Sequence, residues 1–299
     1  MSITSAMFTG VNGMKAQSEA MGVISNNISN VNTIGYKDAR TIFSDLLSQS
    51  IGHNNSQVGL GTQVQKVENQ FYGGSLQTTS NISDVALQGD NLFFAVTTDP
   101  TTVVANVNTN TSAKLTKAGS FAVSNTAASA GPPVVAAGNY LVNPDGKFVL
   151  DSAGSSINFA TWTPGAAPAG GVVGTFGKIN AIDADGTIHA LDTNGLAMTA
   201  AGTGKIGVIR VLVPGELQKN GDSTYGATPS AGVPASYANA AGSILSPTEK
   251  MVANSLESSN VDMASEMVNM IVTQRAYSAN SKTITVNDQL TNDAIQMVR

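Results

Sequence analysis

Apolar and small residues near the amino end recur at alternating intervals of four and three. The positions are Met7, Val11, Met14, Ser18, Met21, Ser25 and Ile28. An interval that averages 3.5 residues is the period of a coiled-coil helix. Two of the positions are serines, and Gly10, Gly13 and Gly22 each lower helix stability by about 1 kcal/mol relative to alanine. The pattern therefore predicts a helix that needs a partner.

The carboxyl end repeats the same spacing. Its positions are Met263, Met267, Met270, Gln274, Tyr277, Ser281 and Ile284. No glycine follows Gly242 and no proline follows Pro247, so nothing interrupts a long helix here. Ser259 and Asp262 resemble a capping box, and the acids Glu257, Asp262 and Glu266 suit the positive end of a helix dipole. We expect a helix from about residue 261 to 298.

The middle of the chain has a different pattern. All ten prolines lie between Pro100 and Pro247, among residues rich in Gly, Ser, Thr, Asn and Val. Short apolar runs flank Asp-Gly steps at 143–146 and 183–186, which is typical of antiparallel hairpins. The fold class expected is α+β, with long terminal helices and a β-rich middle. Periodicity leaves two arrangements open, a helical hairpin within one chain or seams that pack between subunits of a polymer. Methionine suits adaptable interfaces of the second kind.

Composition removes several function classes. The formal net charge is −5 and only 12% of residues are charged, so the chain has no electrostatic footprint for nucleic acid. No polybasic run suggests an anionic membrane surface, and no apolar stretch is long enough to span a bilayer. The absence of cysteine excludes disulfides, thiolate metal sites and cysteine nucleophiles. The amino end has no secretory signal pattern.

The motifs with possible chemistry are better explained as turns. Residues 202–207 fit G-x-G-x-x-G, but the next residues look like a strand, whereas a nucleotide site needs a helix there. The acids at 183–192 imitate a calcium loop incompletely. His53 and His189 are isolated from each other in sequence, and no G-x-S-x-G motif exists. We expect no enzymatic activity and no catalytic, cofactor-binding or metal-binding residues.

Two longer motifs carry a resemblance. The first runs from Ile24 to Lys37 and is dense in asparagine, which bonds local backbone and tolerates left-handed conformations. It is expected to end the first helix and turn the chain, with Gly35 as the residue after the helix. The residues of this connecting turn are Asn26, Asn27, Asn30, Thr33, Gly35, Tyr36 and Lys37. The second motif is Ser259-Asn260-Val261 followed by residues 266–277, EMVNMIVTQRAY.

In these motifs the sequence resembles the bacterial flagellar axial family of rod and hook proteins. The resemblance covers roughly residues 1–125 and 200–299. It implies an inner coiled-coil domain of residues 1–35 and 250–299, a connecting segment of 36–80, and a β-rich outer domain of 81–249 with room for a small excursion at 126–199. The residues expected to pack between subunits are Met7, Val11, Met14, Met21, Ile28, Met263, Met267, Met270, Tyr277 and Ile284. For Arg275, a solvated face and an intersubunit pair are both open.

The resemblance also implies a mechanical function. The subunit would polymerise with itself, contact neighbouring rod, hook-cap and hook–filament junction proteins, and leave the cell through the type III export apparatus, without binding nucleic acid or entering a membrane. The short segment 48–57 favours the extracellular hook, a universal joint that transmits torque. The alternative is a distal or proximal subunit of the periplasmic rod, because residues 182–186 and 207–213 resemble the rod proteins. A second alternative is a secreted β-rich adhesin or binding module.

Overall fold

The computed structural model describes residues 3–46, 49–50, 57–101, 103–104, 107, 112–127, 137–165, 174–234, 237 and 249–297. The chain forms two compact units. The helical unit contains Met1–Val31, Lys37–Gln70 and Val261–Arg299, and the β unit contains Asn32–Tyr36 and Phe71–Asn260. The α+β class predicted from the sequence is confirmed, because the two terminal helices pack together and the middle is antiparallel β structure.

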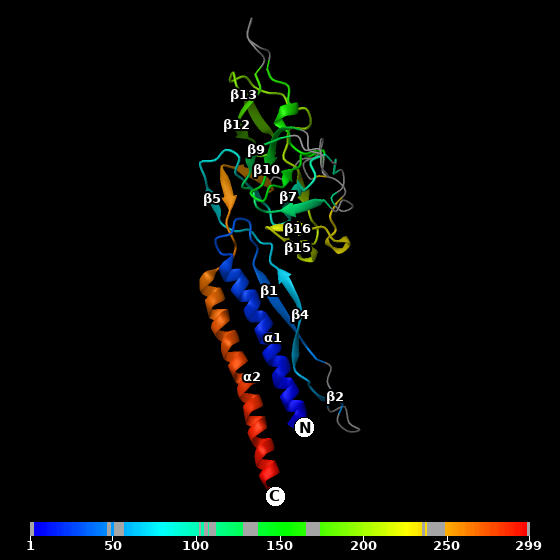
Figure 1. The fold of residues 1–299 in the computed structure, drawn as a ribbon, viewed down its shortest axis with the longest axis vertical. Helices are drawn as coiled ribbons and strands as arrows, with labels where there is room; N and C mark the ends of the chain where they lie inside the picture. The colour runs from blue at the N-terminus through cyan, green and yellow to red at the C-terminus, as the bar shows by residue number, and fades with distance from the viewer. Residues whose placement is uncertain are drawn as a thin grey trace. The chain divides into compact units, whose positions relative to one another are not determined.

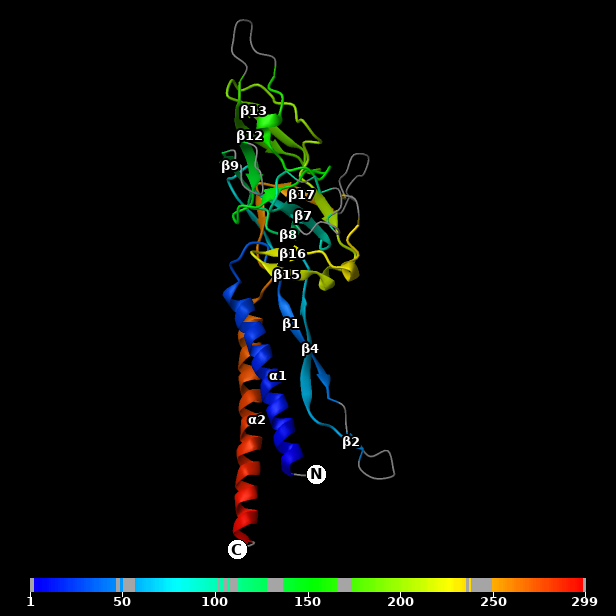
Figure 2. The same ribbon diagram turned by 45° about the vertical axis from the view of Figure 1, so that its right-hand side comes forward.

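The helical unit consists of two long helices and a β-hairpin. Helices α1 (Ile3–Ser29) and α2 (Met263–Met297) lie side by side (Figures 1 and 2). Strands β1 (Ala39–Asp45) and β4 (Thr62–Asn69) pair antiparallel, and both contact α1. The short strands β2 (Gln49–Ser50) and β3 (Gln57–Val58) pair with each other. The segment expected only to connect therefore contributes a hairpin to this unit.

Small residues form the contact between α1 and α2. Gly10, Gly13, Ala16 and Ala20 are all buried. A Cβ added at Gly10 would lie 3.0 Å from Cγ1 of Ile284, and one added at Gly13 would lie 2.8 Å from Nδ2 of Asn280. Two of the three glycines that weaken the isolated helix, Gly10 and Gly13, thus lie where the two helices approach closely. Within one chain, the two helices therefore contact each other mainly through residues that do not belong to the predicted apolar seam.

The helix ends differ in detail from the predictions. Helix α1 ends at Ser29, so Gly35 is not the residue that follows the helix. Gly35 has a φ of +68°, and an added Cβ would lie 2.6 Å from the backbone nitrogen of Ala118. This close approach and the positive φ explain the glycine. At α2 the cap is Asp262 rather than Ser259, because its carboxylate accepts a hydrogen bond from the Ala264 N–H at 3.0 Å.

An eight-stranded antiparallel sheet organises the β unit. Its order is β15 (Gln218–Gly221), β16 (Thr224–Gly226), β8 (Ala113–Thr116), β7 (Leu92–Thr97), β11 (Phe148–Val149), β10 (Gly138–Val142) and β9 (Ala122–Thr126), and β14 (Val208–Arg210) also pairs with β7. Three further antiparallel pairs are β12 (Phe176–Ile182) with β13 (Ile188–Asp192), β17 (Lys250–Ala253) with β6 (Val85–Gln88), and β18 (Ser255–Glu257) with β5 (Leu76–Thr78). Short 3₁₀ helices are η1 (Phe159–Thr161), η2 (Pro214–Glu216) and η3 (Pro229–Ala231).

Strand β7 divides the core of the β unit. Its side chains alternate between two apolar clusters, as the period of two in a strand requires. Phe94 and Val96 pack with Phe159 and Trp162 in one cluster. Phe93 packs on the other side with Leu115 and Tyr225, among others. A strand that is apolar on both faces is therefore covered on both faces.

The predicted hairpin turns are confirmed. Gly146 has a φ of +76° in the turn between β10 and β11, and its N–H donates to the Asn143 carbonyl at 3.0 Å. Gly186 has a φ of +87° in the turn between β12 and β13, where the imitation of a calcium loop lies. The G-x-G-x-x-G residues lead into strand β14 and not into a helix, as predicted.

Candidate functional site

Several exposed side chains of α2 are apolar. Met267, Val268 and Ile271 are 51%, 60% and 50% exposed, and we call these three residues the outer patch. Residues three and four apart share one face of a helix, so the outer patch forms a continuous stripe. Arg275 lies one turn after Ile271 on the same stripe and is exposed. An exposed apolar stripe on a helix with few charged residues marks an interaction surface.

The opposite side of α2 is mixed, because it includes the half-buried Met270 and Ile284 together with polar residues. Glu266 and Thr273 are the buried residues of this helix, and Asn280 meets the glycine face of α1. Hydrophobic burial is the main favourable term in helix packing. Polar side chains share this side with the half-buried Met270 and Ile284, while Met267 and Ile271 lie outside, so α2 is only weakly amphipathic. The contact within the chain therefore uses little of the apolar surface of α2.

The residues predicted to pack between subunits occupy several environments. Met7, Met14, Met21 and Ile28 on α1 and Met270 and Ile284 on α2 are half-buried. Val11, Met263, Met267 and Tyr277 are exposed. Ile284 lies next to Gly10 and so also takes part in the contact between the helices of one chain. The others leave accessible apolar surface on both helices.

Asn27 joins the end of α1 to the start of the hairpin. Its side chain is only 1% exposed. Its Nδ2 donates to Oδ1 of Asp38 at 2.5 Å and to the Ala39 carbonyl at 2.8 Å, while its Oδ1 accepts from the Ala39 N–H at 3.2 Å. This amide fixes the direction in which β1 leaves the helix. It is one residue of the predicted connecting turn with a defined structural role.

The other turn residues stabilise local geometry. The Asn30 N–H donates to the Asn26 carbonyl at 3.2 Å, and its Nδ2 donates to Oδ1 of Asn26 at 2.7 Å, both at the end of α1. In the β unit, the Tyr36 N–H donates to the Thr33 carbonyl at 3.2 Å, while the Gly35 N–H donates to the Glu257 carbonyl at 2.8 Å.

Two residues near the end of the turn are buried. The Tyr36 ring lies 4.0 Å from Nζ of Lys219, whose pKa is lowered by burial. Lys37 is fully buried in the helical unit.

The helical unit also contains a groove that sequence reasoning missed. It has a volume of about 520 Å³ and is lined by residues of α1, of β1 with the preceding Asp38, and of α2. Ala20, Val23 and Ile24 supply apolar lining, and Glu266 lies among the lining residues. From its position in the sequence, Glu266 is expected only to interact with the helix dipole. Its burial depends on elements more than 200 residues apart, and no local pattern reveals it.

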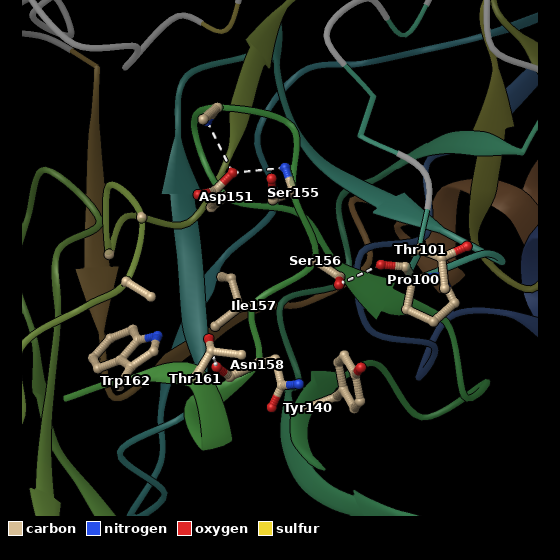
Figure 3. A pocket seen from close by; sticks show the side chains of 14 residues that line it. Pro100, Thr101, Tyr140, Asp151, Ser155, Ser156, Ile157, Asn158, Thr161 and Trp162 are labelled. Carbon is tan, nitrogen blue, oxygen red and sulfur yellow. Dashed lines mark hydrogen bonds between the residues drawn. The ribbon is translucent and has the colours of Figure 1, made fainter. Parts of the chain in front are cut away.

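A second cleft lies in the β unit (Figure 3) and has a volume of about 490 Å³. Its polar groups serve nearby backbone. Oδ1 of Asp151 accepts from the N–H groups of Ala153 at 2.9 Å and Ser155 at 2.8 Å, and the Ser156 hydroxyl donates to the Pro100 carbonyl at 2.7 Å. Among the described lining residues, no nucleophile is bonded to a general base. The cleft is best explained as part of the folded framework.

The remaining charged contacts are local. Burial opposes the ionisation of Asp185, but hydrogen bonds from Lys205 and Thr187 outweigh it and lower the Asp185 pKa to about 2. His189 contacts Asp183 at 2.8 Å, and His53 lies outside the described residues. Within the described ranges, no group of three potential ligands gathers as a metal site, and neither helix is apolar enough over a sufficient length to cross a membrane.

Comparison with known proteins supports the sequence resemblance. Residues 7–37 match the family described as "Flagella basal body rod protein", and residues 252–297 match "Flagellar basal body rod FlgEFG protein C-terminal". The chain is 30% identical to the flagellar basal-body rod protein FlgG of Bacillus subtilis, over 98% of this chain and 99% of that protein. It is also 30% identical to the FlgG of Agrobacterium fabrum, over 95% of this chain and 96% of the relative.

Hook proteins match over a smaller part. The flagellar hook protein FlgE of Treponema pallidum is 38% identical, but over 29% of this chain and 21% of that protein. The matches therefore favour the rod, given above as the alternative, over the hook. The chain has two terminal helices that flank antiparallel β structure in the sequence, matches the family at both ends and has a full-length relative at 30% identity, so it belongs to the bacterial flagellar axial protein family of structural subunits.

Proposed function

We propose that this protein is a subunit of the flagellar rod, the driveshaft of the flagellum, and that it assembles helically with copies of itself. The length of the similarity supports the rod, since the FlgG proteins match over nearly their whole length. The hook interpretation depended on the short segment 48–57. The length of that segment is weaker evidence for choosing between rod and hook than an alignment that includes the β unit.

The exposed apolar side chains of α2 are the observation that carries the assembly. Burial of half-exposed apolar side chains against another copy removes them from water, which favours association. The exposed residues of the predicted seam, Val11, Met263, Met267 and Tyr277, would take part in these contacts. Repetition of one such contact from copy to copy gives a helical polymer, provided that the two contacting surfaces differ.

The proposed location and partners follow from the rod. The subunit would lie in the periplasmic part of the flagellum, next to other axial proteins, and reach it through the type III export apparatus. Packed helices along the axis would transmit torque. A polymer held by many apolar contacts resists twisting better than one held by exposed polar contacts, because apolar packing is dense and leaves few alternative arrangements.

Gene deletion followed by electron microscopy of isolated basal bodies tests the proposal. We expect the deletion strain to lack the distal part of the rod and all structures beyond it, and the intact gene to restore them. A strain with a complete rod that lacks only the curved hook would instead establish the hook alternative. Electron microscopy of the purified chain provides the second test. A chain that stays monomeric at high concentration and high salt would contradict self-assembly.

A further inference from the structure

The groove of the helical unit contains a buried acid with weak partners. Glu266 is 8% exposed. Its two hydrogen bonds, from Nδ2 of Asn27 and Nδ2 of Asn269, both measure 3.4 Å, which is longer than the usual 2.7–3.2 Å. A side-chain amide has two protons, and those of Asn27 already serve Asp38 and Ala39 at shorter distances. The carboxylate of Glu266 therefore receives little compensation for its burial.

The groove also lacks an available cation. Asp38 lines it with Glu266, and the one cation among the described lining residues is Arg40. Its guanidinium is engaged with Glu68, at 3.0 Å from that carboxylate. A buried carboxylate without a cation is costly, and a guanidinium is the group that compensates it best because it bonds both oxygens at once. The groove is thus complementary to an arginine that comes from outside the unit.

Arg275, one helical turn beyond the outer patch, can supply such an arginine. Within the described residues, the Arg275 side chain makes no hydrogen bond or ion pair. Nine residues separate it from Glu266, which is two and a half helical turns, so the two side chains lie on opposite faces of α2. They cannot meet within one copy. In two copies, the outer patch of one can face the groove of the next.

We propose that Arg275 of one copy enters the groove of a neighbouring copy and pairs there with Glu266, while the outer patch covers the apolar lining. This inference rests on the proposed self-assembly and names its contact. Because the donor and acceptor surfaces lie on opposite faces of one helix, each copy can give and receive the same contact. Such a heterologous contact does not close on itself in pairs and can extend into a polymer.

The test compares critical concentrations for polymerisation of the purified full-length chain, measured by sedimentation. We expect Arg275→Gln and Glu266→Gln each to raise the critical concentration about 30-fold or more. The double variant should be no worse than the worse single variant, because both remove the same pair. Lys282→Gln is the matched control, since Lys282 is an exposed cation on the same stripe whose side chain has no bond within the described residues. It should change the critical concentration less than twofold.

Disulfide mapping provides a second measurement that does not depend on Glu266 variants folding. The natural chain has no cysteine, so introduced pairs are unambiguous. Ser265 lines the groove and Ser278 lies one turn beyond Arg275 on the outer stripe. The two are about 20 Å apart along one helix, too far for a disulfide within a copy. The double variant Ser265→Cys, Ser278→Cys should oxidise to a ladder of multimers, whereas either single variant should stop at dimers.

The outcomes separate this inference from the proposed function. Polymers of Arg275→Gln at an unchanged critical concentration, or polymers without a disulfide ladder, would overturn the pair and leave self-assembly standing. Equal losses in Arg275→Gln and Lys282→Gln would also overturn it, because they would indicate a general effect of charge. Failure of the unmodified chain to polymerise would overturn both proposals.

Discussion

Replacement of Ile271 by aspartate should strongly weaken assembly and leave the monomer folded. Ile271 is 50% exposed, so burial of its remaining surface in a polymer contributes about 1 kcal/mol per contact. A carboxylate at that position must also lose its water, which costs about 2 kcal/mol or more. The sum of about 3 kcal/mol corresponds to a rise of about 100-fold in critical concentration. In the monomer the side chain remains in water, and the free energy of unfolding should change by less than about 1 kcal/mol.

Sedimentation gives the critical concentration, and circular dichroism during urea unfolding gives the stability of the monomer. Leu212→Asp is the control, because Leu212 is 70% exposed but belongs to the β unit. We expect this variant to polymerise almost as the unmodified chain does. The reasoning would be refuted if Ile271→Asp polymerised normally, or if Leu212→Asp were equally defective.

Three further predictions concern single positions. Asn27→Ala should lower the free energy of unfolding of the helical unit by about 2 kcal/mol, because it removes three hydrogen bonds at a buried site. Urea unfolding measures this change, and an unchanged urea midpoint would contradict the role of Asn27 in joining the helix to the hairpin. Gly119→Ala should lower the melting temperature severely, since the added Cβ would overlap the Val85 carbonyl oxygen. Gly22→Ala meets nothing within 4 Å and should raise helix stability by about 1 kcal/mol. Lys205→Met should raise the Asp185 pKa from about 2 toward 3.8 in a carboxyl NMR titration. The small stabilisation from this depressed pKa is present above pH 4 and lost as the pH falls toward 2, so the variant should show a weaker acid dependence.

Sequence patterns predicted the elements of this protein better than their contacts. Both helices and the Asp-Gly hairpins follow from local signals, namely the seam spacing, the absence of Gly and Pro after residue 247, and the turn chemistry. The face of α1 that packs against α2 could not be predicted from these local signals. Small residues and apolar residues repeat with the same period on that helix, and hydrophobicity alone selects the apolar set. The close approach at Gly10 and Gly13 depends on size, which becomes apparent only with α2 in place.

The candidate site was predictable only in part. Apolar seam positions and an exposed Arg275 could be named from the sequence, but their outward direction could not. Strands β1 and β4 lie in a segment with no strong alternation of apolar and polar residues, so the hairpin was not expected. The groove needs α1, β1 and α2 together, and the burial of Glu266 follows from that assembly of distant segments.

The contact between α1 and α2 has a consequence for copies outside a polymer. Thr273, Asn280 and Glu266 gain little from leaving water, so these three residues add little to the free energy that holds the two helices together. A copy outside a polymer would therefore hold its two helices together only weakly. Stiffness would then belong to the polymer as a whole, and each copy would gain it only on assembly.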